Sequence, residues 1–244
     1  MRLTDFRVLT FDCYGTLIDW ESGVVEALRP LTGKAAHPLT RNEILETHAF
    51  HESSQQRQTP AKPYRDLLSV VFKRLAEQWG VSVTHEECAA YGRSVGTWPA
   101  FEDSPGALQY LKTFYKLVIL SNVDNGSFEG SKTRLQVEFD AVVTAEDAGS
   151  YKPSLRNFEH MMERLGAGLG GTTFGKGDVL HVAESLFHDH KPANAFGLAS
   201  CWIHRRHGEG GFGATMHPGD MPRTDFRFTS MAALAQAHQE QSRA

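Results

Sequence analysis

The distance between the first two strand-like segments is the feature that most restricts the fold. The apolar run VLTF (8–11) ends at Asp12, and the next such run, KLVILS, covers 116–121. Apolar runs of this length, followed by polar or small residues, are typical of buried parallel strands. One helix and two short loops usually connect neighbouring parallel strands. The gap here is several times longer, so a separate unit must be inserted between the two strands.

The inserted segment has the pattern of a small helical domain. In YRDLLSVVFKRLAEQWG, the apolar residues recur every three or four positions and form one helical face. Helical periodicity recurs in four stretches, at 21–31, 40–50, 63–79 and 84–95. We therefore expect residues 17–98 to form a helical cap, inserted into a core domain that consists of residues 1–16 and 99–244.

The rest of the chain alternates strand-like and helix-like segments. The further strand-like runs are FDAVVTA (139–145), DVLHVA (178–183), ASCWIHR (199–205) and DFRF (225–228). Helical patterns lie at 153–166 and in the closing segment that begins at Ser230. This alternation predicts an α/β fold with a doubly wound, Rossmann-like parallel sheet. Such sheets bind ligands at the carboxyl ends of their strands, so we expect a site between that edge and the cap.

Composition and charge favour a small diffusible substrate in a reducing compartment. The net charge is −4 and no long run of Lys or Arg occurs, so the charge pattern does not favour binding to nucleic acid or to anionic membranes. The three cysteines, Cys13, Cys88 and Cys201, are far apart and lack metal-binding spacing. The N-terminal residues do not resemble a signal peptide, and no apolar run is long enough to span a bilayer. We therefore expect a soluble, cytoplasmic protein.

Polar side chains follow four of the predicted strands where each strand ends. They are Asp12, Ser121 with Asn122, Lys152, and Glu184 with Asp189. Turn amides beside a strand-end carboxylate can hold an anion or a developing oxyanion, and a neighbouring lysine favours the ionised carboxylate. Each element alone is ordinary turn or surface chemistry. Together, at four successive strand ends, they indicate a catalytic site.

The residues around the fourth strand end leave several roles open. Glu184 and Asp189 can bind Mg²⁺, activate water or support the lysine. His188 and His190 stand two positions apart, and we expect them on the surface rather than at a metal. The Gly-rich stretch 207–222 is expected to be a long surface connection, and a mobile flap near the site is the alternative.

The motifs DCYGT, LSN and YKP, together with the acidic fourth element and the early helical insertion, resemble the haloacid dehalogenase (HAD) superfamily over nearly the whole chain. Phosphatases of that superfamily usually carry a second aspartate two positions after the nucleophile, where this chain has Tyr14. The pattern is therefore closer to the L-2-haloacid dehalogenase group. The stretches FDCYGTLIDWE, GSYKP, AESLFHDH and RRHGEGGFGAT are most similar to its L-azetidine-2-carboxylate hydrolase branch.

The resemblance implies a covalent mechanism without a cofactor. Asp12 would attack the carbon that bears the leaving group, and water would hydrolyse the resulting aspartyl ester. Lys152 would keep Asp12 anionic and its pKa low. Ser121 and the turn amides of Cys13 and Tyr14 would bind the substrate carboxylate and the oxyanion. Asn122 would hold these donors in position.

Two departures from the dehalogenase pattern concern the water and the leaving group. Counting back from Asp189, Glu184 and Leu186 stand where dehalogenases carry the Ser and Asn that orient the hydrolytic water, so Glu184 is a candidate base. Dehalogenases receive the halide with a cap arginine, whereas the comparable region here offers Phe50, His51 and Glu52, with Arg57 only later. Glu52 or His51 would suit an amine leaving group better.

Aromatic residues near the expected mouth of the site, including Trp20 and Trp98, are candidates for its wall; packing of cap against core is the alternative for Trp98. Many members of the superfamily are dimers, which implies a homodimer. A Mg²⁺-dependent phosphatase and a binding module without catalysis remain alternative functions.

Overall fold

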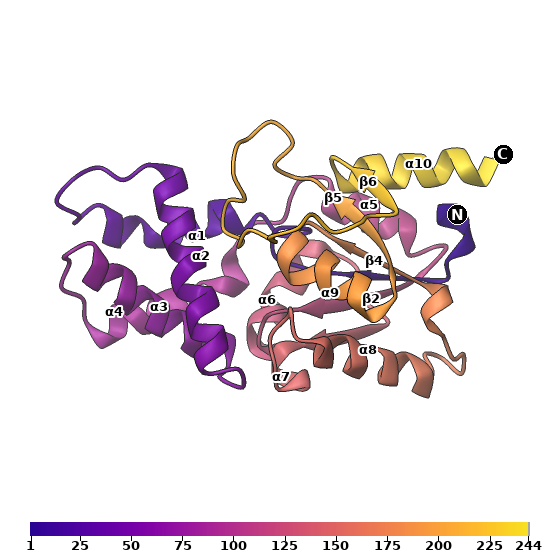
Figure 1. The fold of residues 1–244 in the computed structure, drawn as a ribbon, viewed down its shortest axis with the longest axis horizontal. Helices are drawn as coiled ribbons and strands as arrows, with labels where there is room; N and C mark the ends of the chain where they lie inside the picture. Colours follow the sequence, from indigo (N-terminus) through magenta and orange to yellow (C-terminus); the bar gives the residue numbers. More distant parts are fainter. Residues whose placement is uncertain (244) are drawn as a thin grey trace.

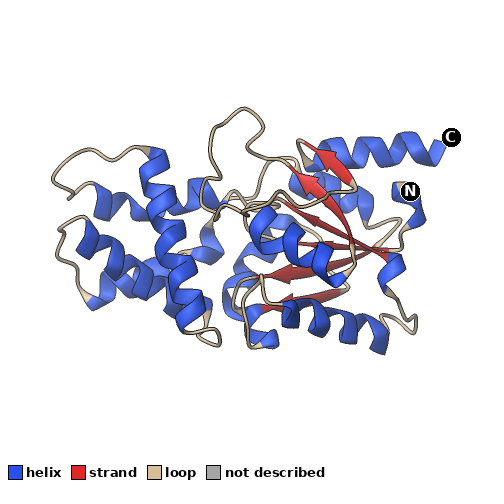
Figure 2. Ribbon diagram, in the orientation of Figure 1, coloured by secondary structure: helices blue, strands red, loops and turns tan. Residues whose placement is uncertain are grey.

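Six parallel strands form the centre of this computed structural model, which describes residues 1–243. Their order is β3-β2-β1-β4-β5-β6, and Figure 2 shows them as one twisted sheet. The strands are β1 (Val8–Phe11), β2 (Lys116–Ser121), β3 (Ala141–Thr144), β4 (Val179–Ala183), β5 (Ala199–Ile203) and β6 (Phe226–Phe228). The predicted α/β fold with a parallel sheet is confirmed. Because β1 lies between β2 and β4, the residues after these three strands meet at one edge.

Helices cover both faces of the sheet, which explains why the central strands are continuous apolar runs. On one face, α8 and α9 pack against alternate residues such as Val8, Val118 and Val143. On the other, α5, α6 and α10 pack against Leu9 and Ile119. These helices are α5 (Ser104–Leu111), α6 (Asn125–Leu135), α8 (Leu155–Ala167), α9 (Lys191–Phe196) and α10 (Met231–Arg243). The shorter elements are α7 (Ala145–Ala148), η1 (Leu3–Asp5), η2 (Val95–Thr97), η3 (Lys176–Asp178) and the π-helical η4 (Leu186–His190).

Four helices lie beyond the carboxyl ends of the strands, at the left of Figure 1. They are α1 (Trp20–Thr32), α2 (Arg41–Gln58), α3 (Tyr64–Gln78) and α4 (His85–Arg93). Thr40 and Thr84 begin α2 and α4 with capping boxes, in which each threonine and the glutamate three positions later satisfy each other's backbone amides. We call these four helices the cap. The proposed boundaries at residues 17 and 98 remain a prediction. Within residues 1–243, no helix has both the length and the apolar character that crossing a bilayer requires.

Helix α2 is longer than the sequence pattern indicated. The predicted helix ended at residue 50, whereas α2 continues to Gln58. Its second half, HESSQQRQ, has no apolar face, yet Glu52 and Gln56 are buried. This half of α2 faces a polar cavity rather than an apolar core, so hydrophobic periodicity could not reveal it.

Two connecting segments join the cap to the core, and they run side by side. The Asp19 amide donates to the Pro99 carbonyl at 2.8 Å, and the Phe101 amide donates to the Leu17 carbonyl at 3.0 Å. Arg205, just after β5, fixes both segments. Its guanidinium donates to the Thr16 carbonyl at 2.9 and 3.1 Å and to both Asp103 carboxylate oxygens at 2.9 and 3.0 Å.

The loop between β5 and β6 is more than the expected surface connection. It passes over the junction of cap and core in Figure 1. The buried Arg206 donates to both carboxylate oxygens of Glu21 on α1, at 2.7 and 2.5 Å, and the Ala214 amide donates to Glu21 at 3.2 Å. Gly213 lies in the left-handed region (φ +60°), and a Cβ there would stand 1.7 Å from Glu21 Oε1. The loop therefore ties α1 to the core.

Candidate active site

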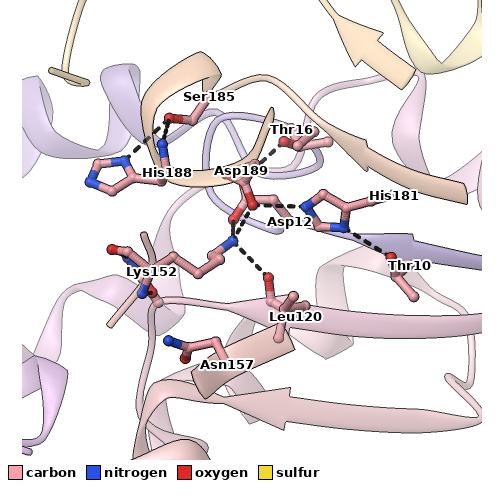
Figure 3. A network of polar contacts seen from close by, with 12 residues as sticks. Thr10, Asp12, Thr16, Leu120, Lys152, Asn157, His181, Ser185, His188 and Asp189 are labelled. Atoms are coloured by element: carbon pink, nitrogen blue, oxygen red, sulfur yellow. Dashed lines mark hydrogen bonds and ion pairs between the residues drawn. The ribbon is translucent and has the colours of Figure 1, made fainter. Parts of the chain in front are cut away.

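Asp12 and Lys152 form the centre of the site, at the carboxyl end of β1. The Lys152 ammonium donates to Asp12 Oδ1 at 2.9 Å, to Asp189 Oδ1 at 2.6 Å and to the Leu120 carbonyl at 2.8 Å (Figure 3). Lys152 is 1% exposed. A fully buried lysine needs such partners, because burial disfavours its charge. Here the two carboxylates outweigh burial and raise the pKa of Lys152 above its ordinary value.

The turn after β1 holds the second oxygen of Asp12. The Thr16 hydroxyl donates to Asp12 Oδ2 at 2.9 Å and accepts the Glu184 amide at 2.9 Å. Gly15 takes a positive φ of +96° in this turn, which glycine adopts without strain. Among the described residues, the amides of Cys13 and Tyr14 have no hydrogen-bond partner. The two residues that follow Asp12 in the chain therefore carry unpaired backbone donors.

Asp189 is fixed by Lys152 and His181. Besides Lys152, the His181 ring lies with Nε2 2.9 Å from Asp189 Oδ1, while its Nδ1 lies 2.9 Å from the Thr10 hydroxyl. Burial alone would raise the pKa of Asp189, but Lys152 and His181 outweigh burial and hold this pKa well below its usual range. Asp189 is therefore ionised and paired with Lys152.

The pKa of Asp12 differs in direction from the sequence expectation. We expected Lys152 to keep it low. Burial raises the pKa of Asp12, and the negative charge of Asp189 raises it further, while Lys152 and Thr16 offset only part of this effect. The reason is that two carboxylates share one lysine in a buried site, and Asp189 has the additional support of His181. The sequence could not reveal that the lysine is shared.

The cavity above Asp12 brings together nine of the thirteen predicted site residues. These nine are Asp12, Tyr14, Trp20, Glu52, Ser121, Asn122, Lys152, Glu184 and Asp189. Four lining residues were not predicted as site residues: Gln56, Tyr64, Ser185 and His188. Gln56 and Tyr64 come from cap segments without a motif. Thr16 and His181 do not line the cavity, but they bond to Asp12 and Asp189. The sequence signal for His181 is a histidine within the buried run VLHVA.

Four predicted substrate-binding residues do not line this cavity. Phe50 is 58% exposed, and His51 bonds to Gln78 at 2.7 Å on the outer side of α2. Trp98 is buried in edge-to-face contact with Tyr14, so cap–core packing is its role. The Cys13 side chain is fully buried, which leaves only its amide for a ligand.

Ser121 and Asn122 behave differently at the end of β2. The Ser121 hydroxyl is buried and, among the described residues, has no hydrogen-bond partner. A buried unpaired hydroxyl beside Asp12 suits a ligand oxygen. Asn122 instead holds Lys152: its Nδ2 donates to the Lys152 carbonyl at 3.0 Å, and its Oδ1 accepts the Lys152 amide at 2.7 Å. Asn122 therefore fixes the backbone of the lysine.

The Tyr14 hydroxyl is engaged away from Asp12. It lies 2.8 Å from the Ser131 hydroxyl on α6, and burial raises the pKa of Tyr14 well above its usual range. Tyr14 is therefore neutral and bonded elsewhere, so it is poorly suited to protonate a leaving group.

Glu184 presents a carboxylate without a side-chain hydrogen bond or ion pair within residues 1–243. Its backbone is fixed, because its amide donates to Thr16 and its carbonyl accepts the Trp202 indole N–H at 2.9 Å. Burial, followed by the charges of Glu21 and Asp12, raises the pKa of Glu184 to about 8. This carboxyl group can therefore exchange a proton near neutral pH.

Glu52 places a second buried carboxyl group on the cap side of the cavity. Its Oε1 accepts hydrogen bonds from the Tyr64 hydroxyl at 2.7 Å and from the side-chain Nε2 of Gln56 at 3.2 Å. Burial raises the pKa of Glu52 to about 7, although Tyr64 opposes this. His48 Nδ1 lies 3.7 Å from Glu52 Oε2, but burial lowers the pKa of His48 to about 3, so this neutral ring does not compensate the charge of Glu52.

The two histidines of η4 are not on the surface, contrary to the sequence expectation. His190 is fully buried, and its Nε2 donates to the Ala183 carbonyl at 2.9 Å. The His188 Nδ1 lies 3.2 Å from the Ser185 hydroxyl, and burial lowers the pKa of His188 to about 4. The loop that contains Thr215 covers the first part of η4, since the Thr215 hydroxyl bonds to Ser185 at 2.9 Å and lies 3.4 Å from His188 Nδ1. Across residues 1–243, no three His, Cys, Asp or Glu side chains are grouped as metal ligands.

Curated relatives are similar to this chain over most of its length. An (S)-2-haloacid dehalogenase from Pseudomonas putida is 28% identical over 211 residues, which cover 84% of this chain and 88% of the relative. A second, from Pseudomonas fluorescens, is 28% identical over 203 residues, covering 81% and 84%. A putative HAD-hydrolase, YfnB from Bacillus subtilis, is 24% identical over 205 residues, covering 81% and 84%.

Solved structures share the fold. The defluorinating L-2-haloacid dehalogenase Rha0230 superposes with a TM-score of 0.77 at 18% identity, covering 100% of this chain and 99% of the other. The L-2-haloacid dehalogenase from Xanthobacter autotrophicus with chloropropionic acid covalently bound gives 0.76 at 17% identity, covering 96% and 98%. The family model for haloacid dehalogenase-like hydrolases matches residues 6–189, a segment that begins just before β1 and ends at Asp189. The chain therefore belongs to the haloacid dehalogenase-like hydrolase family.

Proposed function

We propose that the protein hydrolyses a small 2-substituted carboxylic acid through an ester on Asp12, and that the leaving group is a strained ring amine, as in L-azetidine-2-carboxylate, rather than a halide. The observation that carries the choice of leaving group is the buried carboxyl group of Glu52 on the cap side of the Asp12 cavity. Among the described residues, four carboxyl groups and one lysine line this cavity, and no arginine does. Such a site favours a zwitterionic amino acid over a halogenated anion.

In the first step, an Asp12 carboxylate oxygen attacks carbon 2 of the substrate. The carbon–nitrogen bond of the ring breaks, and its electron pair stays on nitrogen. The ring nitrogen enters protonated, so it leaves as a neutral primary amine. Glu52, whose pKa of about 7 lets it hold a proton at neutral pH, donates that proton to the amine and becomes a carboxylate partner for the ammonium.

In the second step, water attacks the carboxyl carbon of the Asp12 ester and releases the 2-hydroxy acid. The unpaired amides of Cys13 and Tyr14, which directly follow Asp12 in the chain, are the proposed donors to the oxyanion that forms. Glu184 is the proposed base. The Asp12 charge is one cause of its raised pKa, so ester formation removes that charge and makes Glu184 ionise more readily when a base is needed.

The substrate panel that tests this proposal has three arms. They are loss of L-azetidine-2-carboxylate, halide release from (S)-2-chloropropionate, and p-nitrophenyl phosphate turnover with Mg²⁺ or with EDTA. We expect the first to be fastest and insensitive to EDTA. Faster halide release would overturn the amine assignment, and EDTA-sensitive phosphate release as the main activity would overturn the whole proposal.

Two further measurements separate the leaving group from the ester. Glu52→Gln should lower azetidine-2-carboxylate turnover by roughly 100-fold or more, whereas Glu46→Gln, on the exposed side of the same helix, should stay near wild type. A single turnover in H₂¹⁸O should label Asp12 before the product. Label found first in the product would exclude the ester.

A further inference from the structure

A second cavity adjoins the one above Asp12. The Asp12 cavity is tight, with about 30 Å³, which is room for a few water molecules. The second cavity has about 280 Å³ and lies between the C-terminal half of α2, the segment Ser150–Ser154 and η4. For scale, a cavity of about 150 Å³ lined by apolar side chains binds benzene. The larger space is therefore beside the nucleophile rather than above it.

The two cavities share a wall. Gln56, Lys152 and His188 line both of them. Gln56 belongs to the cap and His188 to η4, so the wall is formed where cap and core meet. Lys152 contributes its buried stem, since its ammonium group is held by Asp12 and Asp189.

The lining of the second cavity is chiefly apolar. Its apolar residues are Pro60, Tyr151, Pro153 and Phe187, and Ser53, Ser150 and Ser154 are among its polar ones. At its solvent side, Arg57 is held by the Ser53 hydroxyl at 2.7 Å. The imidazole of His188 turns Nδ1 toward Ser185, as Figure 3 shows, and its buried Nε2 has no partner among the described residues. A buried polar atom without a partner at the junction of the two cavities suits a water or a polar ligand atom. An apolar occupant is favoured by the lining of the second cavity.

We propose that the second cavity is a substrate subsite, which binds an apolar substituent carried by the 2-substituted acid beyond its reacting carbon, up to about the size of a six-carbon chain or ring. The carboxylate of such a substrate stays near Lys152 and the free amides, and the substituent passes between Gln56 and His188. The preferred substrates are then larger than unsubstituted three- or four-carbon acids. This inference holds for either leaving group.

Binding of unbranched carboxylates tests the subsite without any chemistry. Acids from butanoate to heptanoate carry no leaving group, so the wild-type protein does not turn them over, and calorimetry gives their Kd. Each methylene that enters an apolar cavity contributes about 0.8 kcal/mol, so we expect Kd to fall roughly fourfold per methylene and about 50-fold over the series. A Kd that changes by less than twofold would overturn the proposal and assign the cavity to solvent access.

Two substitutions test whether the alkyl chain of the carboxylate binds in this cavity. Phe187→Ala removes part of the apolar wall, and Pro60→Trp fills the space from the exposed end. Each should reduce the ratio of butanoate Kd to heptanoate Kd at least fivefold, whereas Phe114→Ala, an exposed aromatic outside both cavities, should leave the ratio as in wild type. Thermal melts identify a variant that fails to fold. If both cavity variants fold and keep the wild-type ratio of the two Kd values, the alkyl chain binds elsewhere and the subsite is refuted.

Discussion

Replacing Lys152 by Met should destabilise the fold in a strongly pH-dependent way. The ammonium of Lys152 is 1% exposed and contacts two buried carboxylates and one carbonyl. Met has a similar length but no charge, so the substitution leaves Asp12 and Asp189 buried without their common cation. Removing one partner of a buried ion pair costs about 3–5 kcal/mol in the free energy of unfolding. For a chain of this size, that corresponds to a loss of roughly 6–20 °C in Tm.

The sign of the pH dependence follows from the two carboxylates. In the wild type, the pKa of Asp189 is lowered, so its ionisation contributes stability above the ordinary aspartate pKa of about 4, and this is lost at lower pH. Without Lys152, burial raises the pKa of both carboxyl groups above that value, so stability is lost as the pH rises. The deficit should therefore be small near pH 4 and large at pH 8.

Urea unfolding of both proteins at pH 5 and pH 8 measures this difference. Lys73→Met is a suitable control, because its ion pair with Glu77 is exposed on both sides and should contribute less than about 1 kcal/mol. A Lys152→Met deficit below about 1 kcal/mol at pH 8, or one that shrinks with rising pH, would contradict the assigned network.

Three further predictions concern the base and the loop after β5. Glu184→Gln should slow ester hydrolysis, so that the alkylated enzyme accumulates in mass spectra of quenched reactions, and it should remove the limb near pH 8 from the rate profile. Arg206→Met leaves the Glu21 carboxylate without its buried partner and should cost about 3 kcal/mol in urea unfolding. Gly213→Ala combines a left-handed φ with a collision against Glu21 and should destabilise the protein by more than about 1 kcal/mol, measured in the same way.

The arrangement of the strands could be predicted because their residues obey local rules. VLTF and KLVILS are buried on both faces, and burial on both faces produces a recognisable run. Because parallel strands end at one edge, the polar residues that follow them had to converge, and Asp12, Ser121 and Lys152 do. This part of the site depended on topology alone.

The remainder of the site depends on three-dimensional packing that leaves no periodic signal. Gln56 lies on a polar half-helix, where no apolar face marks the inner side. His188 is only partly exposed, because Thr215, from a loop far along the chain, lies against it and Ser185, whereas His190 is fully buried and bonds to the end of β4. The raised pKa of Asp12 comes first from burial and then from the charge of Asp189, which shares Lys152 with Asp12. Burial and pKa shifts of this kind follow from distances between residues that are far apart in the sequence, and only the folded structure gives those distances.

The paired connecting segments between core and cap also have a consequence for folding. Val8 of β1 pairs with Lys116 of β2, so the first strand pair of the sheet cannot close until all of the intervening chain has been looped out. If α1–α4 form first, the hydrogen bonds between residues 17–19 and 99–101 already hold the ends of the insertion together. The loop still to be closed then shrinks to about 25 residues, which lowers the entropic cost of closure by about 1 kcal/mol. Formation of the cap would thus bring β1 and β2 together during folding, in addition to any part that the cap has in binding a substrate.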